Sequence, residues 1–223
     1  MEATHRESAE AIRGLLANAQ ASPDVFRAAL TSVAPSHRDA WLDLVLALDA
    51  IPDDGPALPR GCVPYLPCSV DVLLQIAEHA GVRSSDVFVD VGSGVGRAAA
   101  LIHLVTGAAA IGLEIQPALV VEARGLATRL GMSRVTVVEG DAALTAGRMM
   151  IGSVFLLYCP FGGERLERLL DDLESIAQTR QIRVCCVDLP LPPRPWLALM
   201  ARPSEGLAIF RSTLRDAPAD DVA

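Results

Sequence analysis

The sequence predicts an α/β fold: a doubly wound, mostly parallel seven-stranded sheet with an antiparallel last strand, plus an N-terminal helical appendage. Three observations support this prediction. Short apolar runs alternate with helical patterns between residues 86 and 190, as in parallel sheets whose strands are joined by helices. A glycine-rich turn follows the first of these runs. The segment 196–215 is typical of two strands around a Pro-Ser-Glu-Gly turn.

Two segments of different composition precede the core. Residues 1–50 show the apolar spacing of helices and form the predicted N-terminal helical segment. Residues 51–68 are rich in proline and are predicted to be a loop or lid. Both segments are candidates for a lid, because they lie just before the first core helix. The core domain is predicted at 69–216, and a disordered tail at 217–223.

Each core element has its own local pattern. Ser69 is placed to cap a helix that ends at Gly81. Strands are predicted at 86–92, 108–115, 134–142, 153–161 and 182–190, and helices at 97–105, 117–132 and 162–178. Only a short region precedes the fourth strand. Ligands bind such sheets at the carboxyl ends of the strands, so we expect the functional site at that edge.

The composition excludes several kinds of function. The 223 residues include no lysine, which excludes a Walker-A phosphate site and Schiff-base catalysis by a lysine. The net charge of −8 disfavours a nucleic-acid partner. The five cysteines form no Cys-x-x-Cys pair, so we expect reduced cysteines and no metal site. No apolar run is long enough to span a membrane, and the N-terminus lacks a signal-peptide pattern, so we predict no membrane partner and a cytoplasmic location.

The glycine turn differs from a dinucleotide fingerprint. Gly92, Gly94 and Gly96 are spaced G-x-G-x-G, whereas the NAD pattern G-x-G-x-x-G needs a glycine where Arg97 stands. Asp90 precedes the turn, where its carboxylate repels a pyrophosphate and attracts a cation. S-adenosyl-L-methionine carries a positive sulfonium and a positive α-ammonium group. The turn therefore favours this cofactor over NAD.

Two more acidic residues end the next two strands. Glu114 lies about 20 residues after the glycine turn, where an acid is placed to accept the ribose hydroxyls. This feature alone fits NAD equally well. Asp141 ends the third strand and is placed to accept from an adenine amino group, with Ala142 beside the ring. Three acids at three successive strand ends are more specific than any one of them.

These segments resemble a known family. VDVGSGVGR, IGLEIQPALV and VTVVEGDA are similar to motifs I, II and III of class I (seven-strand, Rossmann-like) S-adenosylmethionine-dependent methyltransferases, and the resemblance covers about 70–214. It implies that Asp90, Gly92 and Gly94 contact the methionine part, Glu114 the ribose and Asp141 the adenine. The predicted cofactor-binding residues are Asp90, Gly92, Ser93, Gly94, Gly96, Glu114, Ile115, Asp141, Ala142 and Tyr158.

The fourth motif, LLYCPFGG, departs from the pattern of methyltransferases that act on planar nitrogens. Pro160 and Phe161 match its end, but Tyr158 and Cys159 stand where a polar side-chain acceptor is expected. We predict Cys159, Pro160 and Phe161 as substrate residues and Tyr158 or Tyr65 as groups that assist proton removal. Alignment of the reactants is the main expected source of catalysis.

A second, local resemblance concerns protein-directed enzymes. Tyr65 and Pro67 in a Tyr-x-Pro loop, together with Ser93 in the glycine turn, are similar to the non-SET protein-lysine methyltransferases. The predicted function is methyl transfer to a nucleophile, with a nitrogen of a protein or small molecule favoured. An RNA methyltransferase and a non-catalytic S-adenosylmethionine-binding protein are the alternatives. The acceptor, the oligomeric state and the existence of a general base stay open.

Overall fold

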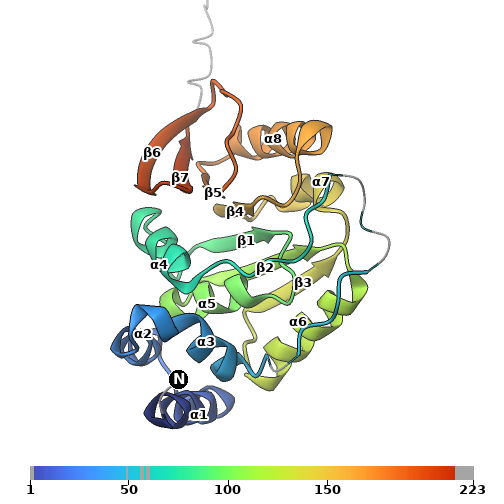
Figure 1. Cartoon of the computed structure of the whole chain (residues 1–223). Coiled ribbons are helices and arrows are strands. Elements are labelled where there is room, and N and C mark those ends of the chain that lie inside the picture. Colours follow the sequence, from blue (N-terminus) through green and yellow to red (C-terminus); the bar gives the residue numbers. More distant parts are fainter. Residues whose placement is uncertain (1–2, 49, 56–57, 59–60, 214–223) are drawn as a thin grey trace, which may run out of the picture.

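One seven-stranded sheet organises the chain, and the predicted fold class is confirmed. The computed structural model describes residues 3–48, 50–55, 58 and 61–213 (Figure 1). The strand order is β3-β2-β1-β4-β5-β7-β6, and β7 pairs antiparallel with both neighbours while all other pairs are parallel. The predicted disordered tail at 217–223 lies outside the described residues.

The strands and helices follow the predicted order. The strands are β1 (Val87–Val91), β2 (Ala109–Glu114), β3 (Val135–Glu139), β4 (Val154–Tyr158), β5 (Arg183–Val187), β6 (Leu197–Ser204) and β7 (Leu207–Ser212). The helices are α1 (Ala3–Ala17), α2 (Pro23–Ser32), α3 (Arg38–Leu46), α4 (Val70–His79), α5 (Arg97–Thr106), α6 (Pro117–Arg129), α7 (Ala142–Thr145) and α8 (Gly163–Ala177). The short α7 was not predicted, because four residues carry no readable helical period.

Local capping explains where α4 begins and ends. The Ser69 hydroxyl accepts the backbone N–H of Val72 at 3.3 Å, as predicted for an N-cap residue. At the other end Gly81 has φ +62°, a conformation that costs glycine little. The polar cap and the glycine thus set the length of the first core helix.

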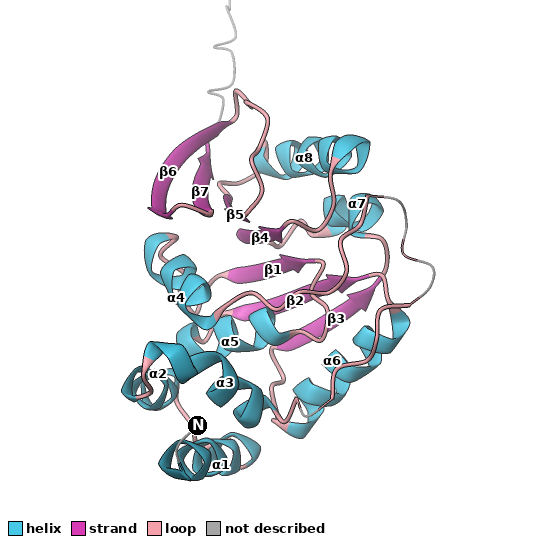
Figure 2. Cartoon of the chain, in the orientation of Figure 1, coloured by secondary structure: helices cyan, strands magenta, loops and turns pink. Residues whose placement is uncertain are grey.

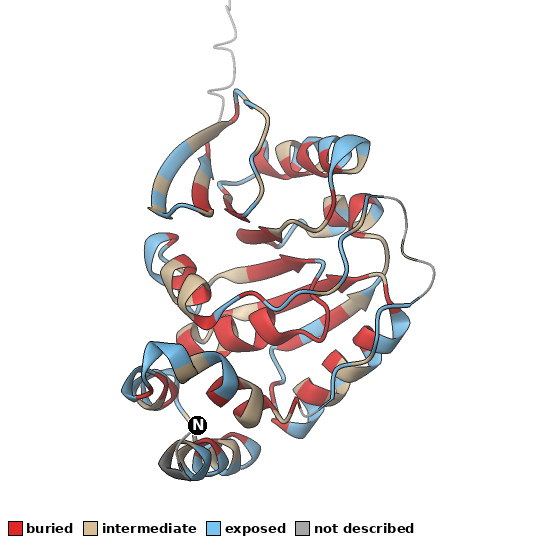
Figure 3. Cartoon of the chain, in the orientation of Figure 1, coloured by how far each residue is buried: buried red, intermediate tan, exposed pale blue. Residues whose placement is uncertain are grey.

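The sheet separates two apolar layers (Figure 2). Phe88 of β1 points into one core with α1 to α5 and part of α6. Val89 and Val91 of the same strand point into the other core, with α7 and α8. This alternation follows from the two-residue period of a strand. Figure 3 shows the central strands buried along most of their length, as expected for a sheet covered on both faces.

The N-terminal helices belong to the first core. Trp41 of α3 is fully buried, and its ring lies 5.8 Å from that of Phe26 of α2, centroid to centroid. Both residues share a cluster with Leu101 of α5. Of the two segments proposed as a lid, the helices therefore pack beside α5, and residues 61–68 of the proline-rich segment run past the carboxyl ends of the strands (Figure 1).

Replacing Trp41 tests this shared core. Trp41→Ala should lower the free energy of unfolding by about 3–5 kcal/mol, because it leaves a large cavity at a fully buried position. Urea denaturation followed by circular dichroism measures the change. The matched control is Val25→Ala on α2, where the side chain is 44% exposed and the expected change is within about 0.5 kcal/mol. Wild-type stability of Trp41→Ala would contradict a shared core.

Candidate functional site

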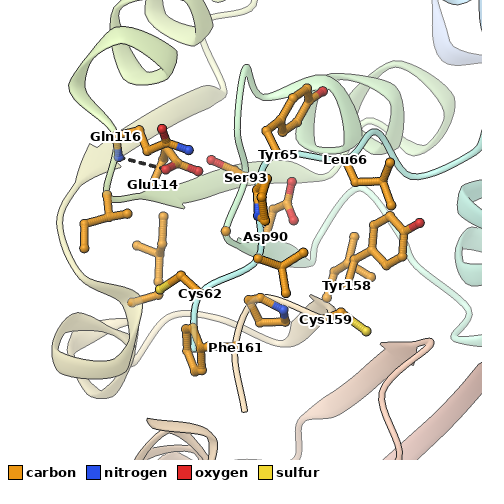
Figure 4. A pocket seen from close by; sticks show the side chains of 18 of the residues that line it. Cys62, Tyr65, Leu66, Asp90, Ser93, Glu114, Gln116, Tyr158, Cys159 and Phe161 are labelled. Carbon is orange, nitrogen blue, oxygen red and sulfur yellow. Dashed lines mark hydrogen bonds between the residues drawn. The ribbon is translucent and has the colours of Figure 1, made fainter. Parts of the chain in front are cut away.

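A cavity lies at the carboxyl ends of β1, β2 and β4, where the topology predicts a ligand site (Figure 4). All residues predicted from the sequence for cofactor or substrate line it, except Gly94 and Gly96. Their individual roles stay predictions. Leu58 is the first described residue along the chain that lines the cavity, so α1 to α3 contribute no wall.

The glycine turn shapes one wall of the cavity. The backbone N–H groups of Gly92 and Ser93 both donate to the carbonyl of Leu113, at 2.9 and 3.0 Å. Gly94 has φ +53°, and a Cβ there would lie 2.0 Å from the ring of Tyr65. Any other residue at this position would push Tyr65 and its loop away. The close approach therefore needs glycine.

Gly96 acts at a different contact. It has φ +77°, and a Cβ there would come within 3.2 Å of the Cβ of Ala123 on α6. Gly96 thus lets α5 and α6 pack closely, next to the cavity but outside its lining.

Asp90 presents a buried carboxylate to the cavity. It is 4% exposed, and no donor among the described residues hydrogen-bonds to its side chain. Burial, together with the smaller effect of the nearby Glu114 charge, raises the pKa of Asp90 to about 7. A buried carboxylate without a donor is costly unless a ligand supplies positive charge. This geometry fits the cationic end of S-adenosylmethionine.

Glu114 is already hydrogen-bonded to the backbone on both sides. Its Oε2 accepts the N–H of Gly94 at 2.8 Å. Its Oε1 accepts the N–H of Gln116 at 2.8 Å, and this second bond is drawn in Figure 4. Each carboxylate oxygen has a second lone pair. Glu114 can therefore hold the glycine turn and accept ribose hydroxyls at the same time.

Asp141 has a cationic partner that the sequence did not reveal. Its Oδ1 accepts the N–H of Ala143, as an N-cap of α7, and also pairs with Nη2 of Arg165 at 2.5 Å. The guanidinium of Arg165 lies 5.2 Å from the ring centroid of Phe161. Arg165 comes from α8, and nothing in the helical pattern of that segment distinguishes it from a solvated arginine. It forms part of the wall at the predicted adenine end.

The described part of the proline-rich segment, residues 51–55, 58 and 61–68, is called the strap below, and its residues 58, 62–66 and 68 line the cavity. Its residue Asp54 accepts the amide of Gln116 at 2.7 Å, and the N–H of Gly55 donates to Gln116 Oε1 at 2.7 Å. On the other side the N–H of Val63 donates to the carbonyl of Pro160 at 3.3 Å. Gln116 was missed by sequence reasoning, because its partners lie about 60 residues away.

The end of β4 is held in an unusual backbone conformation. Cys159 has φ 41°, and its thiol donates to the carbonyl of Asp188 at 2.6 Å. Burial raises the pKa of the Cys159 thiol and of the Tyr158 and Tyr65 hydroxyls. The Tyr65 hydroxyl is buried without a partner among the described residues. These groups are therefore protonated at neutral pH in the ligand-free protein, which does not favour either tyrosine as a base.

The described residues show no group of three or more His, Cys, Asp or Glu side chains arranged to hold a metal ion. No helix in the described part of the chain is both long enough and apolar enough to cross a membrane.

Comparison with known proteins supports the family resemblance predicted from the sequence. Residues 65–129 match the family described as histone methylation protein DOT1. An RNA methyltransferase from Salinibacter ruber, solved with S-adenosyl-L-homocysteine, has a TM-score of 0.50 at 24% identity over 70% of this chain and 98% of its own. The putative methyltransferase yhhF from Escherichia coli has a TM-score of 0.55 at 19% identity over 74% of this chain and 92% of its own. A search among curated proteins gave no match.

At these identities the solved structures establish the fold. The DOT1 match covers the strap end, the glycine turn, β2 and α6, and it agrees with the local resemblance to non-SET protein-lysine enzymes. The predicted family resemblance, to a class I methyltransferase fold with this local similarity to non-SET enzymes, is confirmed. The same findings support the predicted enzyme class, an S-adenosylmethionine-dependent methyltransferase, and its cofactor.

The raised pKa of Asp90 predicts how cofactor binding depends on pH. A bound cation favours the ionised carboxylate, so the affinity for S-adenosylmethionine should increase as the pH rises to about 7 and then level off. Below that pH, each unit should weaken binding by up to about tenfold. Calorimetric titration between about pH 5.5 and about pH 8 measures the profile.

Asp90→Asn is the matched control, because it keeps the size of the side chain and removes its charge. It should bind more weakly and with a flat profile. In the ligand-free protein the pKa of Asp90 is about 7 when folded, against about 4 when unfolded, so its ionisation lowers stability as the pH rises through that window. At pH values above about 7, Asp90→Asn without ligand should therefore melt higher than the wild type. Parallel binding profiles for the two proteins would contradict this assignment.

Proposed function

We propose that this methyltransferase transfers a methyl group from S-adenosylmethionine to a nitrogen of a protein. The observation that carries the proposal is the buried Asp90 carboxylate, which has no donor among the described residues and faces the cavity of a methyltransferase fold. The DOT1 match favours a protein acceptor, and so does the net charge of −8, which suits a basic protein better than a nucleic acid. A small-molecule amine is the second candidate.

The cavity has separate places for the parts of the cofactor. Figure 4 shows Glu114 and Gln116 on one side of Asp90, and Leu66 and Tyr158 on the other. In this proposal Asp90 attracts the cationic centre and Glu114 accepts from the ribose. Asp141 accepts from the adenine with its second oxygen, because Oδ1 already pairs with Arg165. The methionine part then points toward Tyr158.

The acceptor side has an apolar rim. Leu66 of the strap is 59% exposed, and it lines the cavity together with Tyr158 and Cys159. No carboxylate or amide side chain stands at the end of β4, so the backbone carbonyls there are the available acceptors for an amine. When bound, the cofactor supplies an activated methyl group. The rim excludes water and aligns a deprotonated amine, which is consistent with catalysis by proximity.

Cofactor binding is the first measurement. In calorimetric titration S-adenosylhomocysteine should bind at micromolar concentration or tighter, and NADH should not compete. Glu114→Ala should weaken binding by about ten- to a hundredfold, because it removes a charged acceptor for the ribose. The variant also frees the N–H groups of Gly94 and Gln116, so its melting temperature is compared with the wild type. Preference for NADH would overturn the proposal.

The acceptor class needs a second experiment. Isotope-labelled S-adenosylmethionine is incubated with a cell lysate, which is then separated into protein, RNA and small-molecule fractions. Label should enter protein as acid-stable N-methyl groups, and Asp90→Asn should transfer little. Label in RNA would replace the protein acceptor by the RNA alternative. Tight cofactor binding with no label in any fraction would favour the non-catalytic binding protein.

A further inference from the structure

A second groove opens at the same edge of the sheet as the cofactor cavity. Residues 186 and 188–191, at and after the end of β5, line one side, and residues 202, 205, 206, 208 and 210 of the β6–β7 hairpin line the other. Leu207 lies opposite Val187 in the antiparallel register, so the turn of the hairpin is at the carboxyl end of β5. We call this space, of about 640 Å³, the hairpin groove.

The wall of the hairpin groove is largely apolar. Leu189, Leu191 and Phe210 are half-buried and pack against the core that contains α7 and α8. The stems of arginine and lysine side chains pack well along apolar surfaces of this kind while their charged ends stay near water. The groove can therefore hold a long basic side chain if an acceptor for its charge lies nearby.

Asp188 supplies such an acceptor. Its backbone N–H donates to the carbonyl of Gly206 at 2.8 Å, which holds it against the hairpin turn. A Cβ on Gly206 would collide with Oδ1 of Asp188, so the glycine leaves room for the carboxylate. The carboxylates of Asp188 and Glu205 line the groove and have no hydrogen-bond or ion-pair partner among the described residues.

The backbone also ties Asp188 to the acceptor end of the cofactor cavity. Tyr158 lies opposite Val187 in the register of β4 and β5, so Cys159 and Asp188 directly follow two paired positions. Asp188 has φ 49° and Cys159 has φ 41°, a conformation that residues other than glycine seldom adopt. The hydrogen bond from the Cys159 thiol to the Asp188 carbonyl links these two turns. The groove and the apolar rim of the cavity are therefore neighbours.

The charge of Asp188 acts on the rim as well. Burial is the main cause of the raised pKa of Tyr158 and of Cys159, and the negative charge of Asp188 is a smaller cause in the same direction. A carboxylate in this position favours a positive group on the acceptor. The reacting nitrogen must be uncharged when it attacks the methyl group, so the positive group belongs on a different side chain of the acceptor.

We propose that the hairpin groove binds the segment of the acceptor protein next to the methylated residue, with Asp188 pairing with a basic side chain of that segment. This proposal rests on the proposed transfer to a protein nitrogen and specifies the acceptor as a basic segment. Asp188 and Glu205 outweigh Arg202 in the lining, so the charge of the groove suits a cationic peptide and repels phosphate groups. The rim holds the reacting nitrogen, and the groove selects its neighbour.

Two synthetic peptides test this selection. One carries a lysine flanked by arginines, and the other has glutamine at each arginine position. Fluorescence anisotropy of the labelled peptides is measured with the wild type saturated with S-adenosylhomocysteine. The arginine peptide should bind about two- to fivefold more tightly, because an exposed ion pair contributes about that much. The preference should decrease as the salt concentration rises.

Asp188→Asn should lose most of this preference and leave the affinity for S-adenosylhomocysteine unchanged. Asparagine is suitable because it keeps the size of the side chain and tolerates a left-handed backbone. Asp24→Asn is the matched control, because Asp24 is an exposed residue of α2 outside both the cavity and the groove, and this change removes the same charge. Gly206→Ala keeps every charge but displaces the Asp188 carboxylate, so it should also reduce the preference.

Equal affinity of the wild type for the two peptides would overturn the proposal, and so would equal effects of Asp188→Asn and Asp24→Asn. Tighter binding of the glutamine peptide would indicate an uncharged partner and would overturn it too. If Asp188→Asn does not fold, Gly206→Ala decides by the same ratio of affinities. If the wild type does not bind S-adenosylhomocysteine, the proposed function fails and this proposal fails with it. If the cofactor binds and only the peptide preference is missing, this proposal fails alone.

Discussion

A single buried guanidinium connects the parts of this protein that the chain places far apart. Arg97 needs partners because an unpaired buried charge is strongly destabilising. Those partners come from Asp39 and Asp43 of α3 and from the carbonyl of Cys68 at the end of the strap. The N-terminal helices thus reach the glycine turn through one side chain. Packing around Trp41, which fixes α3 on the core, therefore also fixes the geometry next to the site.

The cavity, in contrast, contains a buried acidic group that lacks a partner. Asp90 is buried like Arg97, but no donor among the described residues satisfies it, and its raised pKa reflects that cost. Natural proteins keep such groups mainly at functional sites, where a ligand supplies the missing partner. Glu114 stands beside it with both oxygens anchored by backbone N–H groups. The pair therefore combines Glu114, an acceptor held in place by backbone hydrogen bonds, with Asp90, a carboxylate placed to bind a cation.

The sequence predicted the fold and the three acidic strand ends because these follow from local rules. Alternating strands and helices bring the carboxyl ends of β1, β2 and β3 to one edge, so Asp90, Glu114 and Asp141 needed no tertiary information. Gln116 and Arg165 were missed because their partners are distant in the chain. Arg97 was noted only as the residue that breaks the NAD pattern, and its ion pairs depend on how α3 docks. The helices proposed as part of the lid proved to be core, because amphipathic spacing does not say which surface a helix covers.

We propose that the strap supplies the acceptor specificity that the fourth motif lacks. Cys159 stands where related patterns place a polar acceptor, and its thiol is engaged with the carbonyl of Asp188, so it stabilises the turn after β4. In this proposal the side chains that select an acceptor are those of the strap, where the exposed Leu66 lines the cavity together with Tyr158. The strap is held at one end by Gln116 and at the other by Arg97. Both anchors lie within the cofactor motifs, so in the proposed function a bound cofactor and the acceptor rim share the same supports.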